Sequence, residues 1–131
     1  MRRIYLIFIL LAILFIAGCS SQTTKTRDNT QTTGDTVRIT ADGFVPNELR
    51  IKVGDTITWI NEDTKDSWPA SAIHPTHAVY PEPGGCIGSM FDACKRLKQG
   101  ESWSFTFNQK GTWGYHDHVN FPGRTGKIIV E

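Results

Sequence analysis

Hydrophobic and polar residues alternate along much of the chain after residue 35, with the two-residue period of strands that bury one face. Ile57 and Trp59, for example, share one face of such a stretch. Turn signals such as Gly54-Asp55 separate the stretches, and no window of convincing length has the period of an amphipathic helix. Many short strands predict an all-β fold, a sandwich or a barrel, for residues 36–131. We expect strands over residues 37–40, 49–53, 56–60, 103–107, 113–115 and 127–130.

Residues 1–19 have the features of a segment that directs export and is then removed. Two arginines precede the apolar run Ile4–Ala17, which is short for a membrane-spanning helix. The run ends in Ile16-Ala17-Gly18-Cys19, which resembles a bacterial lipobox. This lipoprotein resemblance implies cleavage before Cys19 and lipid attachment to its sulfur, which would anchor the mature protein to the cell membrane or outer membrane, outside the cytoplasm. An uncleaved signal anchor is the alternative.

Residues 20–35 are rich in Thr, Gln, Asp and Asn and contain no large apolar residue. Such a segment cannot bury enough surface to offset the entropy lost on ordering, so we expect a disordered tether. A flexible chain of this length has an r.m.s. reach of roughly 20–24 Å, enough to lift a small domain clear of lipid headgroups.

The charge balance argues against a role in nucleic-acid binding. The chain has 14 basic and 13 acidic residues, and removing residues 1–19, which contain two arginines and no acid, leaves 12 basic residues. A near-neutral mature chain lacks the basic surface that binds phosphate backbones. We therefore expect no nucleic-acid partner.

Three stretches of the β domain resemble the cupredoxin family, in particular its plastocyanin and amicyanin type. Residues 44–61, FVPNELRIKVGDTITWIN, are similar to the front half of such a domain. Residues 111–116, GTWGYH, and residues 126–130, GKIIV, are similar to the back half. The resemblance implies a Greek-key β-sandwich with its copper-binding loops at one end.

The sequence departs from the blue-copper ligand pattern of the family that it resembles. A blue centre needs a cysteine thiolate just after the Gly-Thr-aromatic strand, and here that position is Asp117. The downstream histidine is replaced by Asn120 or a neighbour, and the upstream one would fall near Ser67. No methionine lies in the closing loop. We therefore expect a non-blue site.

All four histidines of the chain lie in two short segments, His74-Pro75-Thr76-His77 and His116-Asp117-His118. The run GTWGYHDH also resembles a ligand strand of multicopper oxidases, in which both histidines of His-x-His bind copper. Residues two apart on a strand point to the same side, so we expect the two segments to meet and bind one metal. Neutral imidazoles suit Cu(II), with Zn(II) next. Taken singly, each histidine would more often be a solvated loop side chain.

Asp117 has three open roles: a metal ligand, a partner that orients a histidine, or a turn former. Orientation of a histidine is the favoured interpretation. Trp68, Trp113 and Tyr115 are expected to pack in the core and the wall of the site.

Cys86 and Cys94 are expected to form a disulfide. A lipoprotein's folded domain lies outside the cytoplasm, where disulfides persist, and with Cys19 lipidated these two cysteines are the only remaining pair. Closing the loop would contribute roughly 2–3 kcal/mol to stability. The alternative is a soft Cu(I) site made by both thiolates with Met90. Within the loop, Phe91-Asp92-Ala93 is expected to form a helical turn and nothing more.

Together these features predict a membrane-tethered, extracytoplasmic copper-binding protein without enzymatic activity. It would carry, buffer or deliver copper through an all-histidine site, with a copper-receiving or redox protein as its partner. An electron-transfer cupredoxin, which the family resemblance implies by default, is the first alternative. An oxidase-type copper module and a metal-free interaction domain are the others.

Overall fold

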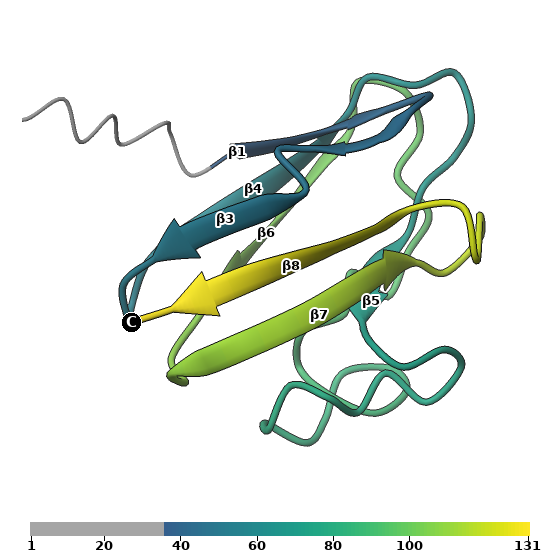
Figure 1. The fold of residues 1–131 in the computed structure, drawn as a ribbon. Helices are drawn as coiled ribbons and strands as arrows, with labels where there is room; N and C mark the ends of the chain where they lie inside the picture. The colour runs from purple at the N-terminus through teal and green to yellow at the C-terminus, as the bar shows by residue number, and fades with distance from the viewer. Residues whose placement is uncertain (1–35) are drawn as a thin grey trace, which may run out of the picture. The chain divides into compact units, whose positions relative to one another are not determined.

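The fold is a sandwich of two four-stranded sheets (Figure 1), seen in a computed structural model that describes residues 36–131. One sheet has the order β2-β1-β4-β6, and the other has the order β3-β8-β7-β5. The first sheet contains β1 (Thr36–Thr40), β2 (Gly43–Val45), β4 (Thr56–Asn61) and β6 (Ser102–Thr106). The second contains β3 (Glu48–Ile51), β5 (Pro69–Ser71), β7 (Gly111–Asp117) and β8 (Thr125–Val130).

The topology joins segments that are far apart in the sequence. β1 pairs with β4 in parallel and β3 pairs with β8 in parallel, so Val37 lies opposite Trp59 and Leu49 lies opposite Ile128. The other strand pairs are antiparallel. The predicted all-β, Greek-key β-sandwich is thereby confirmed. In the described part of the chain no helix is long and apolar enough to cross a bilayer.

The predicted signal peptide at 1–19, the lipidated Cys19 and the tether at 20–35 lie outside the described residues.

Most of the expected strands are present, with two differences near the start of the domain. Residues 43–45 form a hairpin with β1, which places Phe44 opposite Ile39, where only a connection was expected. The hairpin forms because it buries Phe44, which is 3% exposed. β3 ends at Ile51, and Val53 lies in the following turn with 44% of its surface exposed.

Aromatic side chains fill the space between the sheets. Trp59 of β4 is fully buried, and its ring lies edge-on to Tyr115 of β7 with centroids 5.5 Å apart. Tyr115 also packs on Phe44 at 4.7 Å, so this residue is in the core as predicted. Contacts of this kind across both sheets make the core one continuous cluster.

The long connection between β5 and β6 contributes to this core. Phe91 is fully buried and packs on Trp59 at 5.5 Å and on Phe107 at 4.9 Å. The helical turn expected at residues 91–93 is wrong, because Asp92 forms an isolated antiparallel bridge with Ala70 instead. Burial of Phe91 draws this segment against β5 in an extended conformation and points Asp92 away from the core.

The same connection brings polar residues to the end of β7, where Figure 1 shows it as loops running beside β5. The Cys86–Cys94 disulfide, expected from the sequence, closes part of it. Gly88 packs so closely that a Cβ there would lie 1.9 Å from the Thr76 carbonyl oxygen and 3.0 Å from the His77 carbonyl carbon. Only glycine allows this approach, which holds the segment containing His77 in place.

Candidate metal centre

The structure brings all four histidines into one cluster. His116 is the penultimate residue of β7 and His118 follows the strand, while His74 and His77 come from the turn after β5. One ring nitrogen from each histidine lies within 4.8 Å of the others. His77 Nε2 is 2.8 Å from His118 Nδ1, and His74 Nδ1 is 3.4 Å from His116 Nε2. The spatial convergence expected from the sequence is therefore present.

The four rings alternate between the two segments around a common centre. Neighbouring centroids lie 4.7–5.3 Å apart. The pairs across the cluster are more distant, 6.5 Å for His74 and His77 and 6.1 Å for His116 and His118. A regular tetrahedral arrangement would make all six distances equal, so this cluster is flattened towards a plane.

His77 is the most constrained member of the cluster. It is fully buried, and its φ of 52° places the backbone in the left-handed region, a conformation that costs about 1–3 kcal/mol for such a residue. The His77 amide donates a hydrogen bond to the Ile73 carbonyl at 2.9 Å, and Nδ1 lies 2.5 Å from Asp92 Oδ2. A carboxylate at Nδ1 keeps the proton there and leaves the Nε2 lone pair facing the other histidines.

Asp92 is itself held by two further donors. Its Oδ1 accepts hydrogen bonds from Trp68 Nε1 at 2.6 Å and from the Cys94 amide at 2.8 Å, and the residue is 5% exposed. The sequence analysis did not identify Asp92 as a site residue. No spacing motif marks it, and only its place inside the Cys86–Cys94 loop could have drawn notice.

Two of the four histidines, His116 and His118, have lowered pKa values. Burial, followed by the neighbouring His77, His74 and His118, lowers the pKa of His116 from 6.5 to about 4, with Asp117 opposing the shift. Burial and then His77 and His74 lower the pKa of His118 as well. Within the described residues, His116 Nδ1 is buried without a hydrogen-bond partner, while Nε2 of the same ring faces His74. Neutral imidazoles with free lone pairs meet the requirements of a metal ligand.

One side of the cluster faces solvent. His77 and His116 are buried, whereas His74 and His118 are partly exposed. Phe121, itself 49% exposed, stacks on His74 with centroids 4.5 Å apart and planes 11° from parallel. Trp68 packs on His118 at 4.6 Å and so forms part of the wall, as predicted. The cluster is thus closed on its inner side and reachable at its outer edge.

Asp117 points to the other side of β7 from the two histidines that flank it. Alternation along the strand puts its side chain on the face of Tyr115. In residues 36–131 the Asp117 carboxylate accepts no hydrogen bond from a histidine. Contrary to the interpretation favoured from the sequence, Asp117 therefore does not orient a histidine, and Asp92 has this role instead. Bonds to the amides of the following turn support the turn-forming role instead. The Asp117 carboxylate accepts hydrogen bonds from five donors: Ser67 Oγ, the Trp68 and Val119 amides, Asn120 Nδ2 and Arg124 Nη1.

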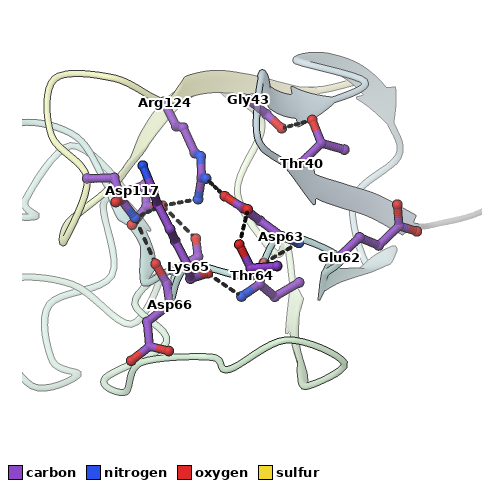
Figure 2. Close-up of polar contacts among 12 residues, drawn as sticks. Thr40, Gly43, Glu62, Asp63, Thr64, Lys65, Asp66, Asp117 and Arg124 are labelled. Carbon is purple, nitrogen blue, oxygen red and sulfur yellow. Dashed lines mark hydrogen bonds and ion pairs between the residues drawn. The ribbon is translucent and has the colours of Figure 1, made fainter.

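Three residues at or near the expected positions of blue-copper ligands, Ser67, Asp117 and Asn120, also come together. Asp117 Oδ2 accepts hydrogen bonds from Ser67 Oγ at 2.7 Å and from Asn120 Nδ2 at 2.8 Å. Arg124, 5% exposed, donates to the same oxygen at 3.0 Å and pairs with Asp63 through its other terminal nitrogen. Figure 2 shows the guanidinium reaching between the two carboxylates. A buried ion-pair network of one guanidinium and two carboxylates thus joins residues at or near the expected ligand positions.

Two curated relatives and one solved structure are informative, while no protein-family model matches the chain. The chain is 36% identical to amicyanin from Paracoccus denitrificans over 84 residues, which cover 64% of this chain and only 55% of amicyanin. It is 33% identical to plastocyanin from Scenedesmus fuscus over 105 residues, which cover 73% of this chain and 98% of plastocyanin. A solved mutant of amicyanin in the Cu(I) form has a TM-score of 0.58 and 29% identity, over 73% of this chain and 80% of that one.

Proposed function

Because the chain belongs to the cupredoxin family, we propose that it is a copper-binding protein whose metal is held by a non-blue, all-histidine centre. The observation that carries this proposal is the convergence of four ring nitrogens within 4.8 Å of one another. The ligands would be His74, His77, His116 and His118.

The shape of the cluster favours Cu(II) over Zn(II). The four rings depart from a regular tetrahedron, because the two opposite pairs are more distant than the four neighbouring pairs, which lie 4.7–5.3 Å apart. The two opposite pairs lie 6.5 and 6.1 Å apart. Tetragonal nitrogen sites suit Cu(II), whereas structural Zn(II) prefers a regular tetrahedron. That the amicyanin structure holds copper supports the same metal.

The protein residues around the cluster would set its properties. Asp92 fixes the orientation and protonation of His77, and the low pKa of His116 keeps that ligand free of a proton at neutral pH. Bound copper would supply an exchangeable ion held by imidazole nitrogens alone, a ligand set that stabilises Cu(II). The partly exposed His74 and His118 offer an edge from which copper can pass to a partner protein. The role proposed for the protein is therefore that of a copper carrier, buffer or delivery protein.

The proposal includes the cellular location of the protein. Lipid on Cys19 and a tether at 20–35 would hold the domain at a membrane surface outside the cytoplasm. The Cys86–Cys94 disulfide is consistent with an oxidising compartment. Mass spectrometry of the membrane-extracted protein should find acyl chains on Cys19 as the first residue, and a soluble protein that retains residues 1–18 would overturn this part.

Calorimetric titration with Cu(II) tests the metal site. The double variant H116A/H118A should lose at least ~100-fold in Cu(II) affinity, because it removes two opposite ligands, while its circular dichroism stays that of a β-sandwich. The matched control is Lys110→Ala. Lys110 is exposed and precedes β7, at the opposite end of the strand from His116, so this variant should bind Cu(II) as the parent does. A double variant with parental affinity would refute the site.

Electron transfer is the second candidate, favoured by membership in the cupredoxin family. Reversible and rapid copper cycling in protein-film voltammetry would support it. Slow or irreversible cycling is the result expected for the copper-carrier role, because reduction to Cu(I) must rearrange a nitrogen site that stabilises Cu(II).

A further inference from the structure

A second group of metal-binding side chains lies beside the histidine cluster, in the disulfide loop. Cys86, Asp92 and Cys94 each offer a ligand atom, and these atoms all lie within 4.8 Å of one another. We propose that reduction of the Cys86–Cys94 disulfide converts this loop into a second metal site, selective for Cu(I). The site goes beyond the proposed function and does not depend on it, since its ligands are not histidines.

The two cysteines are placed so that reductants and copper can reach them. Both are exposed, and their Cα atoms are 5.6 Å apart. A metal–sulfur distance of ~2.3 Å allows two sulfurs on one metal to lie up to ~4.6 Å apart, a separation that side-chain rotation can produce at this Cα spacing. Only Asp92 of the three is buried, so the group has a solvent side made of sulfur and an inner side made of oxygen.

The loop should keep its shape after the disulfide opens, because contacts other than the S–S bond hold it. Phe91 is fully buried in the core, and its carbonyl accepts a hydrogen bond from the Ser71 amide at 2.7 Å. The Ala93 amide donates to the Pro69 carbonyl at 3.0 Å, and the Cys94 amide donates to Asp92 Oδ1 at 2.8 Å. On the Cys86 side, Pro83 and Ser89 form an isolated antiparallel bridge, and the Met90 amide donates to the Glu82 carbonyl at 2.8 Å. Both thiols would therefore remain neighbours in the folded protein.

The chemistry of the donors selects the oxidation state. Soft thiolate and thioether sulfurs prefer Cu(I), whereas imidazoles suit Cu(II). Met90, 49% exposed, adds a thioether to the same loop. The reductant is a dithiol: its two sulfurs join in a new disulfide, the Cys86–Cys94 bond breaks, and each of these sulfurs takes one proton. Cu(I) then binds both sulfurs as thiolates and displaces the two protons.

Asp92 links the two sites. Its Oδ2 contacts His77 Nδ1, and its Oδ1 accepts the Cys94 amide. One protein would then hold a site for each oxidation state of copper, joined through a single carboxylate.

Anaerobic competition with the Cu(I) chelator bicinchoninate tests the proposal. The full chain is used with Cys19→Ser throughout, so that no third thiol competes. Dithiol-reduced protein should bind one more equivalent of Cu(I) than the oxidised protein and show ultraviolet absorption from sulfur–copper charge transfer. The variant C86S/C94S, and the reduced protein alkylated at both thiols, should behave as the oxidised protein does.

A variant of the first site separates this proposal from the proposed function. Reduced H116A/H118A should keep the thiolate-bound Cu(I) although its Cu(II) site is lost. If reduced protein bound no more Cu(I) than its alkylated form, the loop would be a structural crosslink only and the second site would be refuted.

Discussion

Replacing Asp92 by Asn tests how the protein prepares its histidines for metal. The substitution keeps the size of the side chain but makes one of its two oxygens an NH₂ group. Asp92 Oδ1 accepts hydrogen bonds from two donors, Trp68 Nε1 and the Cys94 amide, so the remaining carbonyl oxygen should stay there. The NH₂ group then faces His77 Nδ1, which is 2.5 Å from the carboxylate in the parent protein.

Asp92→Asn should move the ring proton of His77 from one nitrogen to the other. An NH₂ group can only donate, so Nδ1 must become the acceptor and the proton must move to Nε2, the atom that lies 2.8 Å from His118 Nδ1. A protonated Nε2 has no lone pair for a metal. Loss of a carboxylate that orients a histidine ligand typically lowers metal affinity by ~10–100-fold, equivalent to roughly 1.4–2.8 kcal/mol.

The assay is Cu(II) titration at pH 7 by isothermal calorimetry, with chelator competition if binding is tight. Asp42→Asn is the matched control, because this aspartate is exposed in the turn between β1 and β2. Asp92→Asn should bind ~10–100-fold more weakly, while Asp42→Asn binds as the parent does. Equal affinity in all three proteins would show that His77 needs no orienting partner or is not a ligand.

Three further predictions concern stability and packing. Arg124→Met should lower the free energy of unfolding by about 3–5 kcal/mol in urea denaturation, because the fully buried Asp117 carboxylate loses its cation; a loss below ~1 kcal/mol would contradict the ion-pair network. The metal-free protein should lose stability as the pH falls from 6.5 to about 4, because in that range His116 is protonated in the unfolded chain but not in the folded chain. The melting temperature should therefore decrease over this range, and His116→Asn should make the decrease smaller. Gly88→Ala should weaken Cu(II) binding by at least ~10-fold, because a Cβ would push on the Thr76 and His77 backbone; unchanged binding with an unchanged melting temperature would contradict the close packing.

Periodicity was enough to predict most of the strands. Ile57 and Trp59 lie on the buried face of β4 as their spacing requires, whereas the last three residues of β7, Tyr115, His116 and Asp117, are buried on both faces of the strand. β2 was missed because a three-residue strand is too short to show a period. The segment 91–93 was misassigned because burial of Phe91, a tertiary effect, decides its conformation.

The candidate site was predictable in its ligands and not in its surroundings. Four histidines in two short segments drew attention by themselves, and the two-residue spacing of His116 and His118 predicted that they would face one metal, although β7 ends at Asp117. Asp92 could not be found, because its role depends on a loop with no regular structure folding back on β5. Asp117 was assigned to a histidine by its neighbours in sequence, although strand alternation sends it to Arg124.

Electron paramagnetic resonance of the Cu(II)-loaded protein tests the central claim most directly. The account predicts an axial, non-blue spectrum whose nitrogen superhyperfine structure fits four imidazoles, reduced to two in H116A/H118A. A narrow copper hyperfine splitting with an intense thiolate absorption band, or a parent spectrum that fits no more than two nitrogens, would contradict it.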